Sequence, residues 1–343
     1  MYKEIDIEPF IEKSSKIPVL DVRTPDEYLK GHIPGAVNFP LFNNNERDII
    51  GKIFNQEGRN PAILKGLEFT GPKLKSFVSG AWDLKHHNQL LVHCWRGGLR
   101  SSSMAWLFDV AGINTYVLKG GYKAFRQFVL NFFQIPFKLL VIGGMTGSGK
   151  TEVLHYLKSM NNQVLDLEAF AHHKGSAFGS LGQDEQNTNE QFENDIFNQL
   201  YKFNIDEIIW IEDESQNIGR NLIPAEFFKQ ILNAHLIFID VNIRERISRL
   251  VREYSLFDRD VLKECIQKIS KRLGGLNTKI ACESLEKKDF YKVADIMLRY
   301  YDKTYLYSLN KHDFSKIHNI EISTEDLPAA IKKILMISKE LNI

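Results

Sequence analysis

The residues with the clearest chemical potential are a cysteine and two arginines in the segment LLVHCWRGGLRS, residues 90–101. The apolar run Leu90–Val92 predicts a buried strand, and the serines after Arg100 predict the start of a helix. Backbone N–H groups in such a loop point inward, and the helix N-terminus adds positive potential. Both effects favour the thiolate form of Cys94, and Arg96 and Arg100 can donate forked hydrogen bonds to an anion. We therefore predict a nucleophilic sulfur that can carry an oxyanion or a persulfide-like group.

The residues expected to hold an anion beside this sulfur all follow the cysteine directly. They are Trp95, Arg96, Gly97, Gly98 and Arg100. The alternative is an inert cysteine at the end of a buried strand. That alternative does not account for two arginines and two glycines within the next six positions.

A second loop that could do chemistry is GMTGSGKT, which fits the pattern G-x-x-x-x-G-K-[ST]. It follows the apolar run FKLLVIGG and precedes EVLHYLKSM, which is the strand-to-helix context that the motif requires. Glycines let the backbone approach a diphosphate, Lys150 neutralises it, and Thr151 can hold Mg²⁺, our candidate cofactor. We assign no residue as a certain metal ligand. The expected diphosphate-binding residues are Gly144, Gly147, Ser148, Gly149, Lys150 and Thr151.

Acidic residues end two of the later predicted strands. The candidates for a general acid, a general base or a Mg²⁺ ligand are Asp166, Glu168, Glu212 and Asp213, with Glu214 in the same run. Ligands bind at the carboxyl ends of parallel strands, where such carboxylates can orient a metal-bound water. Each of them can equally serve as a helix N-cap.

The segment AHHKGSAFGS, residues 171–180, is rich in Gly and Ser and contains basic and titratable side chains. Near a phosphate site, such a segment predicts a substrate loop, with His172 and Ser176 as its candidate residues. The alternative is an ordinary polar surface loop.

The run Asn242–Lys279 contains ten basic residues and five acidic ones. Such a run usually marks a solvated helix face. Its basic surplus also makes it the candidate for contacts with a nucleic-acid backbone, through Arg244, Arg246, Arg249 and Arg252. Four later tyrosines could stack on unpaired bases or belong to a core, and these are Tyr300, Tyr301, Tyr305 and Tyr307.

The whole chain has 343 residues, which at about 150 residues per domain predicts two domains. Its net charge of +1 excludes a global basic field, so any nucleic-acid site must be a local patch. The three cysteines form no C-x-x-C pair and fit a reducing cytosol, with Cys265 and Cys282 structural. Without a secretory signal or a run of about 20 apolar residues, we expect a cytoplasmic monomer and no membrane partner.

Short apolar runs alternate with helical segments along the chain. The expected strands are 17–22, 90–92, 114–118, 137–144, 163–167, 208–213, 236–241 and 319–323. Thr24 is expected to cap a helix with Pro25 at its first position and Glu27 three residues after the cap. Residues 43–86 show little periodicity and are expected to be less regular. The alternation in the second half predicts a parallel sheet with helices on both faces.

The first half of the chain resembles a rhodanese, or sulfurtransferase, domain. The resemblance lies in LDVRTPDEYLKGHIPGAVNFP, VHCWRGGLRS and YVLKGGYKAFR. It implies that Cys94 carries a sulfane sulfur and that Asp21 and Arg23 belong to the conserved frame, where we expect a structural ion pair. The segment HCWRGGLRS also satisfies H-C-x-x-G-x-x-R-S, the phosphate-loop pattern of protein tyrosine phosphatases.

A rhodanese domain followed by a P-loop domain resembles the family of tRNA 2-selenouridine synthases over essentially the whole length. Four further segments add to this resemblance, and these are DLEAFAHHKGSAFG, QFEND, WIEDES and YYDKTY. Lys174 stands where the family pattern has Arg. It implies an α/β fold with a rhodanese-like domain at 1–133. A P-loop NTPase-like parallel-sheet domain follows at 134–343, with a helical C-terminal part that binds tRNA.

The family resemblance also implies the reaction. Wobble 2-thiouridine is S-geranylated with geranyl diphosphate, and selenophosphate from a partner source then supplies selenium through Cys94. Two other functions stay open on the residues alone. One is an ATP-dependent tRNA sulfurtransferase, and the other is a Cys-dependent phosphatase fused to a nucleotide-binding module.

Overall fold

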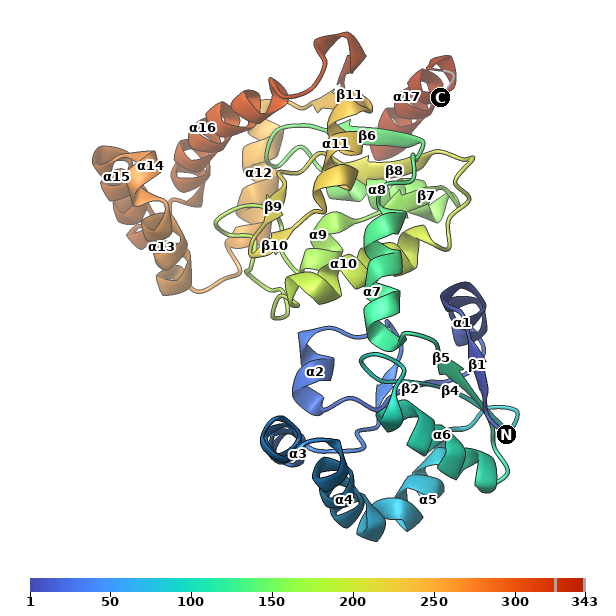
Figure 1. Ribbon diagram of the computed structural model, residues 1–343. Helices are drawn as coiled ribbons and strands as arrows, with labels where there is room; N and C mark the ends of the chain where they lie inside the picture. The colour runs from blue at the N-terminus through green and yellow to red at the C-terminus, as the bar shows by residue number, and fades with distance from the viewer. Residues whose placement is uncertain (324–325, 342–343) are drawn as a thin grey trace. The chain divides into compact units, whose positions relative to one another are not determined.

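The computed structural model of the chain describes residues 1–323 and 326–341. It divides into two compact units, Met1–Phe132 and Phe133–Ile343. Each unit contains a five-stranded sheet with helices packed around it (Figure 1). The predicted α/β fold class is therefore confirmed.

The sheet of the first unit is parallel throughout and has the strand order β1-β5-β4-β2-β3. Its strands are β1 (Lys3–Ile5), β2 (Val19–Asp21), β3 (Val37–Asn38), β4 (Gln89–His93) and β5 (Asn114–Leu118). The central strand, β4, is buried over its last four residues. Continuous apolar runs mark such strands because both faces of a parallel sheet are covered. Cys94 comes directly after this central strand.

The helices of the first unit are α1 (Ile7–Ser14), α2 (Pro25–Lys30), α3 (Asn44–Glu57), α4 (Arg59–Thr70), α5 (Leu74–Leu84), α6 (Leu99–Val110) and α7 (Gly121–Phe132). A 3₁₀ turn, Gly71–Lys73, joins α4 to α5. The predicted capping box at α2 is confirmed, because Thr24 accepts from the backbone of Glu27 and the Glu27 side chain accepts from the backbone of Thr24.

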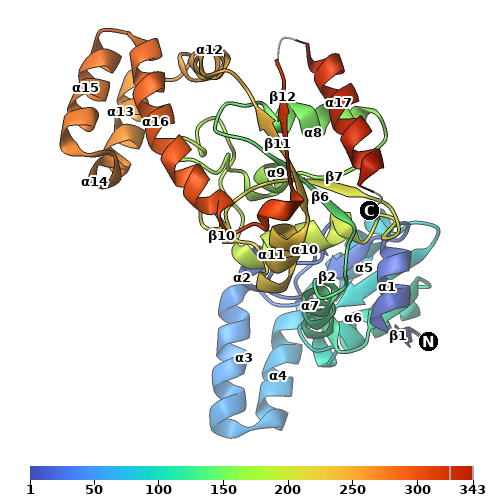
Figure 2. The ribbon, with the colours of Figure 1, turned by 90° about the horizontal axis from the view of Figure 1, so that it is seen from above.

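The prediction that residues 43–86 are less regular is wrong, because this segment forms α3, α4 and α5. Figure 2 shows α3 and α4 side by side as a hairpin. A capping box between Asn43 and Glu46 starts α3, and Gly58 lies between the two helices. No residue of α3 is buried, so its sequence carries no strong apolar stripe.

The sheet of the second unit is also parallel and has the order β12-β11-β6-β8-β7. Its strands are β6 (Leu139–Gly143), β7 (Gln163–Leu165), β8 (Ile209–Glu212), β11 (His235–Asp240) and β12 (Ile317–Glu321). The last strand begins and ends two residues before the predicted range of 319–323. A small antiparallel pair, β9 (Asn217–Ile218) and β10 (Asn221–Leu222), lies apart from this sheet.

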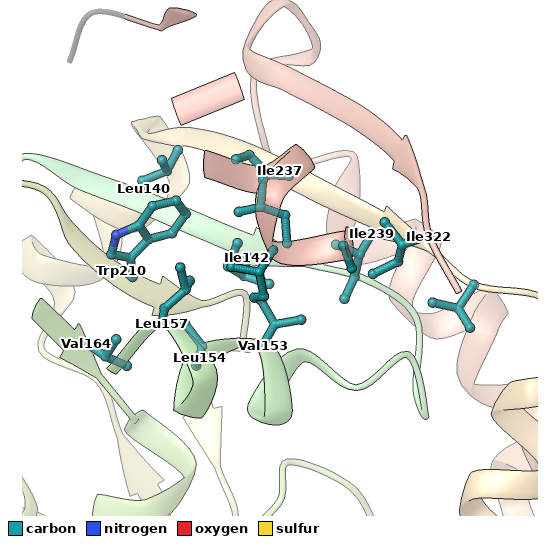
Figure 3. Close-up of a cluster of buried hydrophobic side chains, with 14 residues drawn as sticks. Leu140, Ile142, Val153, Leu154, Leu157, Val164, Trp210, Ile237, Ile239 and Ile322 are labelled. Atoms are coloured by element: carbon teal, nitrogen blue, oxygen red, sulfur yellow. The ribbon is translucent and has the colours of Figure 1, made fainter. Parts of the chain in front are cut away.

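Side chains from the strands and from two helices form the core of this sheet. Figure 3 shows Leu140 and Ile142 of β6 and Trp210 of β8 gathered with Val153 and Leu154. The two valine and leucine side chains come from α8 (Lys150–Ser159). Residues of α17 (Leu327–Glu340) complete the same buried cluster. The core therefore anchors the helix that follows the P-loop directly to the central strand.

The remaining helices of the second unit are α9 (Leu167–Ala171), α10 (Asn189–Leu200), α11 (Ala225–Asn233), α12 (Ile243–Tyr254), α13 (Arg259–Lys268), α14 (Ser270–Leu273), α15 (Gly275–Glu286) and α16 (Phe290–Leu309). The 3₁₀ turn Phe314–Lys316 precedes β12. Helices α13, α14, α15 and α16 form a helical part with its own buried cluster (Figures 1 and 2). Within the described residues, no helix is both long and apolar enough to cross a membrane.

Candidate functional site

The first candidate site is the loop between β4 and α6, which contains Cys94. The sulfur is buried, and its Sγ lies 3.2 Å from Oγ of Ser101 and 3.9 Å from the carbonyl oxygen of Gly98. Gly97 has a φ of +65°. A Cβ there would come within 2.8 Å of the carbonyl oxygen of Leu118, so both the conformation and the space require glycine. The loop thus surrounds the thiol with backbone and one hydroxyl.

The start of α7 fixes the backbone on either side of the thiol. The N–H of Tyr122 donates to the carbonyl of Cys94 at 2.8 Å, and the N–H of Lys123 donates to that of Trp95 at 2.9 Å. Gly121 has a φ of +59°, and a Cβ there would collide with the carbonyl oxygen of Cys94. These contacts hold the cysteine loop rigidly, as a preorganised anion site requires.

The two arginines of this loop have different surroundings. Arg100 forms a two-pronged ion pair with Glu27 of α2, at 2.5 and 3.0 Å. Burial acts to raise the pKa of Glu27, but the hydrogen bond and charge of Arg100 outweigh it and hold that pKa below its usual value. Arg96 is exposed. The expected role of Arg100 as a free anion donor therefore needs correction, because its guanidinium already joins the loop to α2.

A buried ion pair lies beneath the loop, as expected for Asp21 and Arg23. Their closest atoms are 2.5 Å apart, and both side chains are almost fully buried. The guanidinium of Arg23 stacks on the ring of Tyr122 at 3.7 Å and donates to the carbonyl of Gly31 at 2.7 Å. The structural interpretation of this pair is confirmed. The ring of Trp95 lies 5.8 Å from that of Tyr122, so the loop rests on this same group.

The second candidate site is the P-loop between β6 and α8. Gly147 and Gly149 have φ angles of +78° and +84°, which side chains rarely adopt. Lys150 donates to the carbonyl of Gly144 at 3.1 Å. The hydroxyl oxygen of Ser148 is buried and has no hydrogen-bond partner within the described part of the chain. These residues therefore present an ammonium and a free hydroxyl at the N-terminus of α8.

Asp213 supports this loop through a tyrosine. The N–H of Gly144 donates to the hydroxyl oxygen of Tyr305 at 3.0 Å, and that hydroxyl donates to Asp213 at 2.5 Å. His312 lies 3.0 Å from the other oxygen of Asp213. Burial and the charge of Asp213 raise the pKa of Tyr305 well above its usual value, so the tyrosine keeps its proton. Both oxygens of Asp213 are thus engaged, which makes it a positioning residue in this arrangement.

The other carboxylates form a group at the ends of β7 and β8. The hydroxyl of Thr151 donates to Glu168 at 3.4 Å, and the N–H of Glu168 donates to Glu212 at 2.8 Å. Burial and the charge of Asp166 raise the pKa of Glu212 well above its usual value. Burial and the charge of Glu168 raise the pKa of Glu214 to about 8. Burial and the neighbouring charges thus favour the protonated forms of Glu212 and Glu214.

Asp166 stands apart from this group in its role. It caps α9 by accepting the N–H of Ala169 at 2.9 Å, and its second oxygen lies 2.9 Å from Nε2 of His155. Asp166 is therefore the N-cap of α9, as the alternative interpretation of its sequence position predicted.

A wide pocket opens over the P-loop. Among the predicted residues, those that line it are Gly147, Ser148, Gly149, Lys150, Thr151, Glu168, Asp213, Glu214, Ser176, Arg249 and Arg252. The predicted residues that do not line it are Gly144, Asp166, His172, Glu212, Arg244 and Arg246. His172 ends α9 instead, with its Nδ1 3.0 Å from the carbonyl of Glu185.

The middle of the loop 171–180, residues 173–177, forms one wall of this pocket. His173 lines the pocket in place of His172, and burial lowers its pKa. Lys174 forms an ion pair with Glu253 of α12, and the N–H of Ala177 donates to the hydroxyl of Tyr301 at 3.0 Å. The loop is thus held against α12 and α16.

The four arginines of the basic run are divided by the fold. Arg246 is 4% exposed, donates to the carbonyl of Thr146 at 2.9 Å and pairs with Asp302. It therefore supports the P-loop and cannot belong to an exposed tRNA patch, which corrects that expectation. Arg249 pairs with Glu152 at the start of α8. The exposed members are Arg244 and Arg252.

Several residues at this pocket carried no sequence signal of their own. His173, Tyr254 and Arg272 line it, and they come from the loop, from α12 and from α14. Tyr300, Tyr301 and Tyr305 line it too, whereas Tyr307 is exposed outside it. The sequence left open whether these tyrosines stack on bases or belong to a core, and the packing of α16 against α12 brings three of them to the P-loop pocket.

Comparisons with known proteins match both units. Residues 137–327 match the family described as tRNA 2-selenouridine synthase AAA domain, and residues 8–128 match the rhodanese-like domain. A tRNA 2-selenouridine synthase of Nitrosomonas europaea is 34% identical over 347 residues, covering 86% of this chain and 89% of its own. The proteins of that name from Shewanella woodyi and Bordetella petrii are 32% and 33% identical. They cover 86% and 85% of this chain, and 88% and 86% of their own.

Proposed function

The chain belongs to the tRNA 2-selenouridine synthase family, and from this membership we propose that it converts 2-thiouridine at the tRNA wobble position to 2-selenouridine. The observation that carries the proposal is the presence of two different anion sites in one chain. One contains the Cys94 thiol and the other is a diphosphate loop around Lys150. Such a pair suits a reaction in which a diphosphate leaves and a chalcogen is transferred. Because the proposed substrate is tRNA, the proposal includes a cytoplasmic location for the enzyme.

The first step is S-geranylation at the P-loop. The thiocarbonyl sulfur of the nucleoside attacks the first carbon of geranyl diphosphate, the carbon–oxygen bond breaks, and diphosphate leaves. Lys150, the hydroxyl of Ser148 and the N–H groups at the start of α8 stabilise the charge that develops on the diphosphate. Fixed donors are effective here because they need no rearrangement during the reaction.

Two side chains of the P-loop site fit a Mg²⁺ ion. The hydroxyl of Thr151 and the carboxylate of Glu168 are 3.4 Å apart, and both are hard oxygen ligands. Among the described residues no cluster of three ligating side chains occurs, so the diphosphate and water would complete the coordination. When bound, the ion neutralises charge on the diphosphate.

The second step is selenation at the Cys94 loop, where the selenium of selenophosphate attacks C2 of the geranylated base, the carbon–sulfur bond breaks and geranylthiol leaves. Water then cleaves the phosphorus–selenium bond and releases phosphate, so the selenium keeps its oxidation state. Alkylation turns a poor leaving group, the thiocarbonyl sulfur, into a geranylthio group that can depart from the base. The exposed Arg96 and the backbone of the cysteine loop hold the selenium-bearing group. Each unit thus contributes one of the two reactions to the same nucleoside.

The test is mass spectrometry of nucleosides from tRNA incubated with the purified protein. Wobble 2-thiouridine with geranyl diphosphate alone is expected to give S-geranyl-2-thiouridine. Selenophosphate added afterwards is expected to convert that product to 2-selenouridine. Formation of product only with ATP would favour a sulfurtransferase, and hydrolysis of an aryl phosphate without tRNA would favour a phosphatase. Either result would contradict the proposal.

A further inference from the structure

A second cavity adjoins the diphosphate pocket and has an entirely different lining. It is lined by side chains of α12, α13, α15 and α16. Its walls are almost wholly carbon. Among the side chains that form them are Leu250, Val251, Phe290, Val293, Ala294 and Met297. A cavity lined by apolar side chains and not filled by the protein can bind an apolar ligand.

The cavity adjoins the P-loop pocket. Thr146 of the P-loop and Ser176 of the loop 171–180 line both spaces, as do Leu250, Tyr254 and Tyr301. The polar pocket that contains Lys150 and the apolar cavity therefore share a boundary. The two neighbouring surfaces fit an amphiphile with a charged end and a hydrocarbon end.

We propose that this cavity binds the hydrocarbon chain of a prenyl diphosphate whose diphosphate lies on the P-loop. The inference deepens the proposed function and rests on it, because it assigns where the geranyl group lies. A nucleotide base needs hydrogen-bond partners along its edges, and these walls offer almost none beyond a few hydroxyls at the mouth. The two phenols at the mouth stay neutral, since burial raises the pKa of Tyr254 and raises that of Tyr301 to about 12.

Two neighbouring turns of α16 set the size of the space. Ala294 is 8% exposed and Met297 is 4% exposed, and residues three apart share one face of a helix. A larger side chain at Ala294 should shorten the space, and a smaller one at Met297 should lengthen it. Ile296 lies between them, is equally buried at 8%, and does not line the cavity. It provides a matched control in the same helix.

The experiment measures the affinity of the full-length protein for inorganic diphosphate, geranyl diphosphate and farnesyl diphosphate by calorimetry. Each buried methylene strengthens binding about fourfold. The wild type should therefore bind geranyl diphosphate at least about tenfold more tightly than inorganic diphosphate. Ala294→Phe should remove most of that preference and leave the affinity for inorganic diphosphate unchanged, which also shows that the variant folds. Met297→Ala should raise the preference for farnesyl over geranyl diphosphate by about tenfold.

The outcomes separate this inference from the proposed function. If Ala294→Phe and Met297→Ala change the preference no more than Ile296→Ala does, while the wild type still S-geranylates tRNA, the chain binds elsewhere and the inference is wrong. If the wild type neither prefers geranyl diphosphate nor S-geranylates tRNA, the proposed function itself fails. Met297→Ala provides an independent result should Ala294→Phe lose its fold, because an altered chain-length preference arises only from a cavity that holds the chain.

Discussion

The cysteine loop and the P-loop are built alike and differ in what stands at their centres. Each joins the carboxyl end of a buried parallel strand to the N-terminus of a helix, β4 to α6 and β6 to α8. Each also uses glycines at positive φ, which is +65° at Gly97 and +84° at Gly149. The shared backbone makes both loops anion sites. The side chain at the centre, a thiol or an ammonium, decides which chemistry each can perform.

The two loops also differ in how their neighbouring charges are used. Beside the cysteine, Arg100 is neutralised by Glu27 of another helix. Beside the P-loop, Arg246 is neutralised by Asp302, whereas Lys150 donates to the uncharged carbonyl of Gly144. Arg100 and Arg246 thus stabilise the shape of the loop beside which each lies. The comparison shows that an arginine beside an anion-binding loop can be paired with a carboxylate of the protein and so stabilise the fold.

The largest expected effect separates the two loops by their products. Cys94→Ser removes the nucleophilic sulfur while keeping a side chain of similar size. We expect loss of 2-selenouridine with unchanged formation of S-geranyl-2-thiouridine, both measured by nucleoside mass spectrometry. Cys282→Ser is the matched control, because this half-buried thiol lies outside both loops. Continued selenation by Cys94→Ser would refute a role of this thiol in selenation.

The reciprocal change is made at the P-loop. Lys150→Ala removes the ammonium that neutralises the diphosphate, and loss of such a fixed charge lowers rates by about 10²–10³-fold. We expect S-geranylation to fall by that factor in single-turnover kinetics, while selenation of tRNA that is already geranylated stays normal. Lys158→Ala, at an exposed position of the same helix, should change neither rate. An equal loss of rate in both reactions would mean that S-geranylation and selenation are not assigned to separate loops.

The next prediction tests whether Arg246 supports the fold. Arg246→Met breaks the pair with Asp302 and removes the hydrogen bond to Thr146. We expect the free energy of unfolding of the second unit to fall by about 3 kcal/mol, the low end for a broken buried pair, because Asp302 stays partly exposed. Urea denaturation measures this change. Arg244→Met, at an exposed position of the same helix, should shift it by less than about 0.5 kcal/mol.

A smaller effect is expected at the two exposed arginines of the basic run. Replacing Arg244 and Arg252 together by Ala removes two cations that can contact phosphates. The slope of log affinity for tRNA against log salt concentration should then decrease in magnitude by about 1.4–1.8, as two lost phosphate contacts imply. Binding titrations at several salt concentrations measure it. Lys52→Ala, on α3, should leave the slope unchanged, and an unchanged slope in the double variant would place the tRNA contact elsewhere.

The last prediction concerns pH and the carboxylates near the P-loop. The folded protein holds the proton of Glu214 up to about pH 8, whereas the ordinary pKa of a glutamate is 4.5. Between these values the unfolded chain has released a proton that the folded chain keeps, so stability should fall as pH rises. Glu214→Gln should flatten this slope in denaturant unfolding between about pH 5 and pH 8. Glu226→Gln, at an exposed position of α11, should leave the slope as in the wild type.

Local features were predictable where a short segment determines its own structure. The Thr24 capping box and the strand Asn114–Leu118 depend on adjacent residues, and both match the prediction. Helices α3 to α5 were missed because they bury few side chains, so periodicity had little to reveal. The same limit applied to the arginines, whose run indicated a charged face but not which member turns inward.

Both loops, and the alternation of strands and helices in the second unit, follow from patterns within short segments of the chain. A strand, glycines at fixed spacing and a helix start are consecutive in the chain, so their geometry follows from local backbone preferences. What surrounds each loop depends on the tertiary structure. The bond from Tyr305 to Asp213 joins residues 92 positions apart, and the apolar cavity is assembled from four helices. Contacts at such separations depend on how the elements pack, and no short pattern encodes that packing.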